Sequence, residues 1–188
     1  ILSNIRQIRG SLPFIMLGFA TDNGTEFMNY SMIKYFGDKK QGIVKLVRRR
    51  PYKKNDNAHV EQKNDTHVRQ LFGYSRLDEK ELVGLMNQIY IDYWNPLNNF
   101  FCPVMKLKKK IRVGGKIKKI YDDPKTPYQR LLDSGTLTEL QVKNLQLKFE
   151  SLDPIKLRKD LNGKMKFFHS ILSKEQTMGN SVLHNKSA

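Results

Sequence analysis

Two kinds of hydrophobic pattern alternate along the first hundred residues. The unbroken apolar run at residues 14–20 predicts a strand that is buried on both faces, and residues 42–47 predict a second, shorter strand. Apolar residues spaced three or four apart predict amphipathic helices. The segments with this spacing are residues 1–10, 27–36 and 78–94. Strands and helices together predict an α/β fold class for residues 1–100.

A polar stretch, NDNAHVEQKN at residues 55–64, predicts the start of another helix, which runs to about residue 71. Asn55 or Asp56 could cap it, because such side chains accept hydrogen bonds from the free N–H groups of a helix start. Glu61 then lies on this helix, whereas Asp22 directly follows the first predicted strand.

Asp22 and Glu61 are candidate metal ligands. Open α/β sheets bind ligands at the carboxyl ends of their strands, where Asp22 is expected, and the Glu61 helix could cross that rim. Carboxylate oxygens suit Mg²⁺ or Mn²⁺. The residues alone leave two plainer interpretations open: Asp22 as a turn former before Asn23-Gly24, and Glu61 as an ordinary exposed acid on a helix.

Beyond residue 100 basic residues interleave with apolar ones around Gly114-Gly115, which predicts a β-hairpin. Thr126 as N-cap and Pro127 at the first helical position predict a helix that ends at Gly135. The chain is thus expected to contain four parts. They are an α/β core (1–100), a basic β-rich DNA-binding segment (101–130), a C-terminal helical segment (131–172, with helices over 137–152 and 154–172) and a disordered tail (173–188).

Charge is the strongest indication of a partner in the composition. The 188 residues include 34 Lys and Arg against 18 Asp and Glu, a net charge of +16, which favours a polyanionic partner. Two clusters, residues 45–54 and 106–125, hold six and nine of the basic residues. A single charge run is usually only a solvated face, but both clusters together favour double-stranded DNA, with RNA as a generic alternative. No apolar run is long enough to span a membrane, and the single cysteine, Cys102, fits a reducing compartment.

The segments TDNGTEF (21–27) and RPYKKNDNAHVEQKN (50–64) together resemble the catalytic core of DDE transposases and retroviral-type integrases, in particular bacterial insertion-sequence transposases. In that family a D-N-G-x-E-F motif after a strand carries the second metal-binding acid, and a polar helix carries the third. The resemblance implies that Asp22 and Glu61 are these catalytic and metal-binding acids in a ribonuclease H-like fold. It also implies two Mg²⁺ (or Mn²⁺) ions, DNA cleavage and strand transfer at transposon ends and target DNA, and a homo-oligomer in the intact enzyme.

Three departures accompany this resemblance. The family's first acid lies on an opening strand, yet no acid precedes Asp22, so we expect an N-terminally truncated portion that is inactive alone. The interval between Asp22 and Glu61 is longer than usual in this group, and Asp65 stands where an aromatic residue is expected. A truncated, non-catalytic DNA-binding protein that modulates transposase complexes is therefore the alternative. Either protein is expected in the bacterial cytoplasm at the nucleoid, and neither at a membrane.

The residues expected to contact DNA have basic or amide side chains in the two basic clusters or on the Glu61 helix. They are Arg50, Lys53, Lys54, Asn57, Lys63, Arg69, Lys106, Lys108, Lys116, Lys118 and Lys119. Because neutralised phosphates release counterions, DNA affinity should fall steeply with salt.

Overall fold

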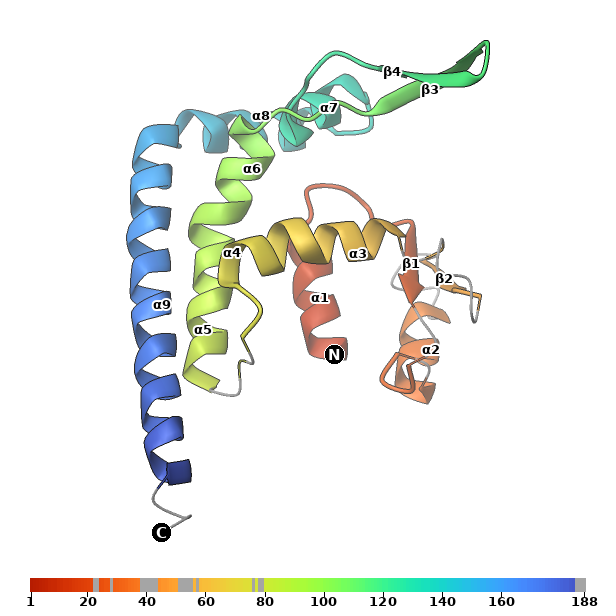
Figure 1. Cartoon of the computed structure of the whole chain (residues 1–188). Helices are drawn as coiled ribbons and strands as arrows, with labels where there is room; N and C mark the ends of the chain where they lie inside the picture. The colour runs from red at the N-terminus through yellow and green to blue at the C-terminus, as the bar shows by residue number, and fades with distance from the viewer. Residues whose placement is uncertain are drawn as a thin grey trace. The chain divides into compact units, whose positions relative to one another are not determined.

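The computed structural model describes residues 1–21, 24–27, 29–37, 44–50, 56, 58–75, 77 and 80–184, and only the backbone of residues 174–184. The chain divides into two compact units, Ile1–Gly73 and Tyr74–Ala188. Helices and short sheets occur together, so the fold is mixed α/β (Figure 1).

The N-terminal unit is built around a two-stranded parallel sheet. Strand β1 (Gly18–Thr21) pairs with β2 (Lys45–Arg48), with Thr21 opposite Arg48. Parallel strands need a crossover connection, and here it contains helix α2 (Tyr30–Gly37). Helix α1 (Leu2–Ser11) precedes β1, close to the prediction for residues 1–10.

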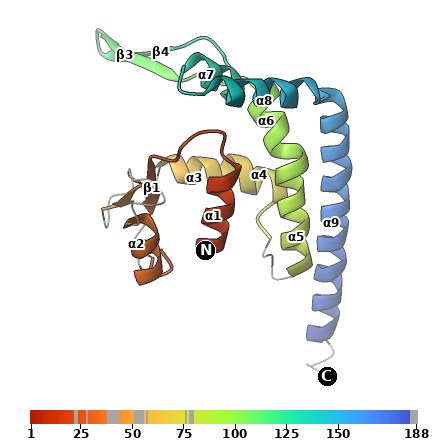
Figure 2. The ribbon, with the colours of Figure 1, turned by 180° about the vertical axis from the view of Figure 1, so that it is seen from behind.

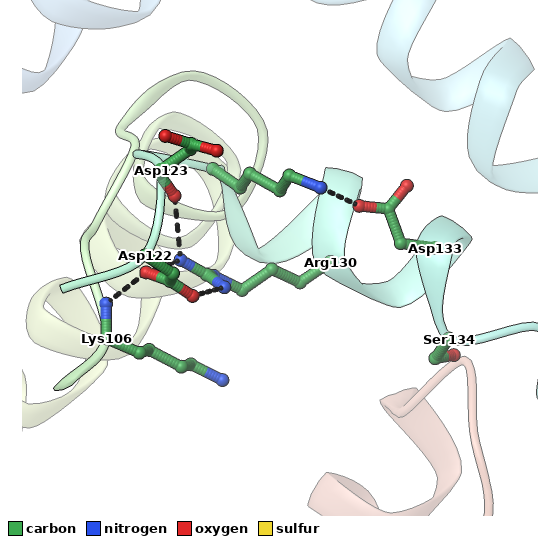
Figure 3. Close-up of a pocket in the computed structure, with 7 residues that line it drawn as sticks. Lys106, Asp122, Asp123, Arg130, Asp133 and Ser134 are labelled. Carbon is green, nitrogen blue, oxygen red and sulfur yellow. Dashed lines mark hydrogen bonds and ion pairs between the residues drawn. The ribbon is translucent and has the colours of Figure 1, made fainter. Parts of the chain in front are cut away.

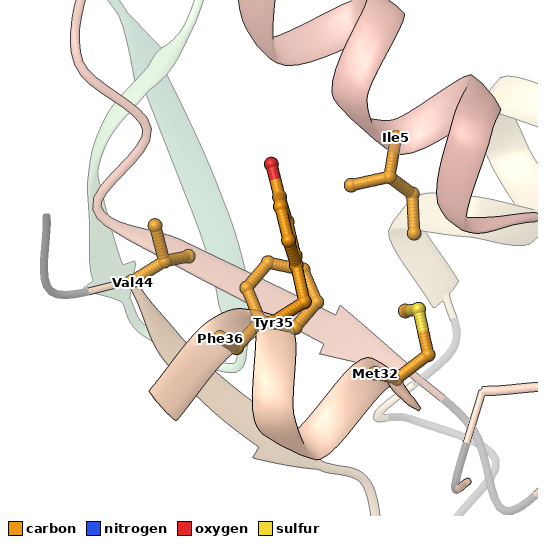
Figure 4. Packing of buried hydrophobic residues seen from close by; sticks show 5 residues of the cluster. All are labelled: Ile5, Met32, Tyr35, Phe36 and Val44. Atoms are coloured by element: carbon orange, nitrogen blue, oxygen red, sulfur yellow. The ribbon is translucent and has the colours of Figure 1, made fainter. Parts of the chain in front are cut away.

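One face of this sheet is packed. The buried cluster consists of Ile5 from α1, three residues of α2 and Val44 just before β2; the α2 residues are Met32, Tyr35 and Phe36 (Figure 4). Phe19 and Leu46, which are register partners, pack against it, and the Phe19 and Phe36 rings stack with centroids 5.1 Å apart. Partners in register lie on the same face of a sheet, so α1 and α2 cover that face.

The prediction of a strand buried on both faces at residues 14–20 is wrong. The strand begins only at Gly18, and Phe14, Ile15 and Leu17 are 44%, 77% and 78% exposed. An apolar run becomes a doubly buried strand only where both sheet faces are covered. Within the described residues the packed cluster lies on one face alone.

A continuous helical run closes the N-terminal unit, as predicted to about residue 71. It comprises α3 (Ala58–Asn64), the π-helical turn η3 (Asp65–Arg69) and α4 (Gln70–Phe72). Gly73 ends it at φ 86°, a conformation that glycine adopts without a steric penalty. The carboxylate of Asp56, expected as a possible cap, accepts hydrogen bonds from Arg50. Asn55, the other possible cap, lies outside the described residues.

The second unit contains a long helical pair. One partner runs through α5 (Lys80–Ile89), the π-helical turn η4 (Tyr90–Trp94) and α6 (Asn95–Phe101); the other is α9 (Pro154–His184). Both views show α9 alongside α5 and α6 (Figures 1 and 2). The buried residues of the pair are Leu82, Ile89, Pro96, Leu97, Phe100, Leu157, Leu161, Phe168 and Leu172.

Two helix ends differ from the predicted ones. The first helix does not stop near residue 94 but continues past Pro96 to Phe101, and Pro96 is in the first turn of α6. Proline lacks the N–H that would bond the preceding turn, and the π-helical turn η4 lies at that point. Helix α9 continues beyond residue 172 to His184, so the structure gives a helical backbone for most of the segment expected to be disordered.

Between these long helices the local predictions are confirmed. Strands β3 (Leu107–Val113) and β4 (Lys116–Tyr121) form an antiparallel hairpin that turns at Gly114, whose φ is 59°. Thr126 caps α7 (Pro127–Asp133) in a capping box with Gln129. Helix α8 (Glu139–Glu150) follows, with a second capping box at its start. In the described part of the chain, no helix combines the length and apolar character needed to span a bilayer.

Aromatic rings join these helices. Tyr128 of α7 lies 5.1 Å from Phe100 of α6 and 5.1 Å from Phe149 of α8, between ring centroids. This packing gives Tyr128 a structural position among the rings of α6, α7 and α8.

Candidate DNA and metal site

The carboxyl rim of the parallel sheet is the first part of the candidate site. Thr21, the last residue of β1, is 4% exposed, and its carbonyl oxygen accepts a hydrogen bond of 2.9 Å from the Arg49 backbone N–H. The chain therefore leaves β2 beside the end of β1. In the sequence Asp22 follows Thr21 directly, but Asp22 lies outside the described residues.

A bidentate ion pair between Arg50 and Asp56, called the Arg50 fork below, connects this rim with the start of α3. Arg50 donates from Nη2 to Asp56 Oδ1 at 2.8 Å, from Nε to Oδ2 at 3.0 Å and from its backbone N–H to Oδ2 at 3.3 Å. These hydrogen bonds hold the pKa of the Asp56 carboxyl below its usual range. The fork joins Arg50 and Asp56, which are six positions apart in the sequence. Helix α3, which starts at Ala58, consequently begins near the end of β2.

Glu61 occupies the first turn of α3 and is exposed. Among the described residues its carboxylate has no hydrogen-bond or ion-pair partner, so its oxygens are available as ligands of the kind that Mg²⁺ prefers. Asp65, one turn further on, accepts a hydrogen bond of 2.9 Å from the Gln70 side chain. The described residues contain no cluster of three or more His, Cys, Asp or Glu side chains suited to a metal ion.

Apart from Arg50, the residues of this unit that are predicted to contact DNA fall into two groups. Lys53, Lys54 and Asn57 lie outside the described residues. Lys63 and Arg69 are exposed on the helical run. The structure does not test contact with DNA for either group, so these assignments stay predictions.

The structure gives the surroundings of two of these cations, Arg50 and Lys63. The Arg50 side chain is 71% exposed, and its Nη1 edge is not used by Asp56. Lys63 Nζ lies 3.2 Å from His67 Nε2. Partial burial, with the nearby charge of Lys63, lowers the pKa of His67 from its usual value of 6.5 and so favours the neutral imidazole.

Many cations of the second unit lie on the hairpin of β3 and β4. Its strands carry seven, four on β3 and three on β4: Lys108, Lys109, Lys110, Arg112, Lys116, Lys118 and Lys119. All seven are exposed, and none forms an ion pair within the part of the chain that the structure describes. Lys110 lies directly opposite Lys119 in the register. Like charges in such a pair destabilise a hairpin, so an anionic partner would relieve this cost.

The base of the hairpin, residues 104–106 and 122–125, is called its foot below and is bound by Arg130. Arg130 of α7 donates to both carboxylate oxygens of Asp122, at 2.6 and 3.0 Å (Figure 3). It also donates to the Val104 carbonyl oxygen at 2.7 Å. Asp122 also accepts from the Lys106 backbone N–H at 2.6 Å. Hydrogen bonds from Arg130, then from Lys106, lower the pKa of Asp122 from 3.8 to about 2. The ion pair is only 18% and 31% exposed at its two side chains.

This foot encloses a pocket of about 310 Å³ with mixed charges. Its second ion pair joins Lys125 Nζ and Asp133 at 2.6 Å, so the charges that line the pocket largely satisfy one another. Sequence reasoning assigned Lys106 to DNA and missed Asp122 and Arg130. An acid directly after a basic strand, followed by an arginine in the next helix, is the signal that could have indicated them.

Comparison with known proteins adds a relative but no family. The uncharacterized protein y4rM of Sinorhizobium fredii (strain NBRC 101917 / NGR234) is 36% identical to this chain over 130 residues. These residues are 69% of this chain but 36% of the relative, so the chain spans about a third of that protein. No protein-family model matches the chain, and no solved structure matches it significantly.

Proposed function

We propose that this chain is part of a DDE-type DNA transposase or integrase, in which Asp22 and Glu61 are two of the acids that hold Mg²⁺ or Mn²⁺. The observation that carries the proposal is the tethered start of α3. Arg50 and Asp56 bring the helix of Glu61 back to the end of β2, which pairs in parallel with the strand that Asp22 follows. On this proposal the sheet and α3 are parts of a ribonuclease H-like core.

The chemistry fits the side chains present. Glu61 offers a carboxylate without a described partner, and two carboxylates with phosphate oxygens form the hard-oxygen set that Mg²⁺ takes. When bound, divalent ions supply charge stabilisation for in-line displacement at phosphorus. The basic hairpin would hold the duplex by its phosphates. The fork between Arg50 and Asp56 would keep Glu61 in position while it binds.

A second candidate function is favoured by a separate observation. The hairpin cations form no ion pair with any described residue, and this feature supports DNA binding whether or not a metal site exists. On this view the chain is a non-catalytic DNA-binding protein that modulates transposase complexes.

Binding of Mn²⁺ to the full chain separates the two. We expect Glu61→Gln to weaken Mn²⁺ binding several-fold, measured by the electron paramagnetic resonance of free Mn²⁺, because it removes one of two charged ligands. Glu81→Gln is the matched control, since Glu81 is also an exposed acid in the first turn of a helix. DNA affinity in EDTA should not fall in either variant.

Equal metal affinities would decide against the catalytic proposal. Equal Mn²⁺ affinities for the wild type, Glu61→Gln and Glu81→Gln would remove Glu61 from the metal site. Salt-sensitive DNA binding together with that result would instead support the non-catalytic function.

A further inference from the structure

The hairpin of β3 and β4 is a two-stranded ribbon without a covering layer. Every residue of the two strands is exposed except Ile120, which is half-buried. Several aliphatic side chains are exposed with the cations, among them Val113 at 61% and Ile117 at 65%. An isolated two-stranded hairpin is at best marginally stable in water. The exposed ribbon therefore presents an interaction surface rather than a buried core.

Both faces of the ribbon have the same chemical character. Register partners share a face, and side chains alternate between faces along each strand. One face therefore carries Lys110, Arg112, Ile117 and Lys119. The other carries Lys109, Ile111, Val113, Lys116, Lys118 and Ile120. A ribbon that lay flat on a single anionic surface would use the cations of only one face.

The foot of the ribbon is fixed even though its strands are uncovered. Arg130 forms two hydrogen bonds with the Asp122 carboxylate there. In addition, the Val104 and Lys125 backbones exchange two hydrogen bonds, of 3.0 and 3.3 Å. Asp122 N–H also donates to the Lys106 carbonyl oxygen at 3.0 Å. The ribbon is thus attached firmly to α7, while its tip at Gly114-Gly115 has no side chains that would widen it.

From these features we infer that the ribbon enters the major groove of duplex DNA tip first, with its two faces toward the two phosphate walls. The inference rests on DNA as the partner in the proposed function, but it does not depend on the metal site. With its faces toward the walls, the ribbon must fit by its thickness, and sheets that pack face to face lie about 10 Å apart. A major groove about 12 Å wide admits a two-stranded ribbon, whereas a minor groove about 6 Å wide is too narrow.

The mixed character of each face fits the two surfaces inside that groove. Lysine and arginine ammonium and guanidinium groups reach phosphates on either wall. Val113 and Ile117, near the tip, can contact the methyl groups of thymine, which lie in the major groove. The paired Lys110 and Lys119 are then neutralised by phosphate instead of by an acid of the chain.

The inference is tested by measuring how the full chain, in EDTA, binds DNA duplexes whose major groove is blocked. Duplexes of one sequence are compared with and without glucose on 5-hydroxymethylcytosine, a group that fills the major groove without changing the charge. We expect the glucosylated duplex to bind at least about tenfold more weakly. Excess netropsin, which occupies the minor groove, should change the affinity by less than about twofold. Equal affinity for both duplexes, or loss of binding with netropsin, would overturn the inference.

A variant of the tip provides a second test. Val113→Ser keeps all charges and, because Val113 is 61% exposed, leaves no cavity in the core; circular dichroism checks that the fold is unchanged. We expect it to weaken binding to the unmodified duplex about threefold, with no further loss on the glucosylated duplex. Ile155→Ser is the control, because Ile155 is an aliphatic residue on α9 that is 81% exposed. Equal effects of the two substitutions would contradict insertion of the tip.

Because these measurements are made without divalent metal, their outcome is independent of the Mn²⁺ test. Failure of the groove inference would leave the metal site untouched, and loss of the metal site would leave the groove inference standing.

Discussion

The salt dependence of DNA binding gives the most quantitative prediction about the hairpin. The perturbation removes the three cations of β4 without adding negative charge. The substitutions are Lys116→Gln, Lys118→Gln and Lys119→Gln, made together. All three lysines are exposed and none is ion-paired with a described residue, so no internal salt bridge is lost. Any change in binding then reports contacts with DNA.

The expected magnitude follows from counterion release. Each neutralised phosphate contributes about 0.9 to the slope of log affinity against log salt, so three lost contacts reduce the slope by up to about 2.7. Between about 50 and about 200 mM salt, the logarithm of the concentration rises by about 0.6. The advantage of the wild type over the variant should therefore shrink by up to about fortyfold across this range.

Fluorescence anisotropy with a labelled duplex measures this slope at several salt concentrations. A control of equal net charge removes three exposed lysines from the helices of the same unit. These substitutions are Lys143→Gln, Lys148→Gln and Lys156→Gln. An unchanged slope in the β4 variant, or an equal change in the control, would refute the assignment of the hairpin as the principal phosphate contact.

Two predictions concern stability. Phe168→Ala should lower the free energy of unfolding by about 3–5 kcal/mol, because Phe168 is 0% exposed. The neighbouring Phe167 is 56% exposed, so Phe167→Ala should change this free energy little. Urea unfolding of the two variants measures the difference. Similar effects would contradict the packing of α9. The pKa of Asp122, lowered from 3.8 to about 2, means that its carboxylate stabilises the folded chain above about pH 4 and loses this effect as the pH falls toward 2. Asp122→Asn should lower the melting temperature at neutral pH and flatten its fall over that interval, and an unaltered acid profile would argue against the ion pair between Arg130 and Asp122.

Local signals made parts of this structure predictable. The hairpin turns at Gly114 because glycine accepts its positive φ, and Thr126 with Pro127 starts α7 with a capping box. These features depend on residues adjacent in sequence, so the pattern contains the information they need.

Features that depend on distant partners were not predictable in the same way. The apolar run at 14–20 looks buried, but only the packing of α1 and α2 on one face decides how much of it is covered. Arg130 bonds the carboxylate of Asp122 but only the backbone carbonyl of Asp123, a difference that two adjacent acids in the sequence do not reveal. The same limit applies to the proposed metal site: the motif suggests metal chemistry for Asp22 and Glu61, but residues so far apart in the sequence come together only through contacts that the motif does not contain, such as the ion pair between Arg50 and Asp56.

The uncovered edges of the hairpin give its lysines a second consequence. Each strand of this two-stranded sheet has an outer edge whose backbone N–H and C=O groups can pair with another chain. Lysines on edge strands oppose such pairing, because two copies would bring like charges together. Removal of the β4 lysines, or their neutralisation by a polyanion, should therefore favour strand pairing between copies. If the hairpin binds DNA as proposed, the charge that attracts the duplex would also oppose strand pairing between free copies, and neutralisation by DNA would favour the assembly of several copies along it.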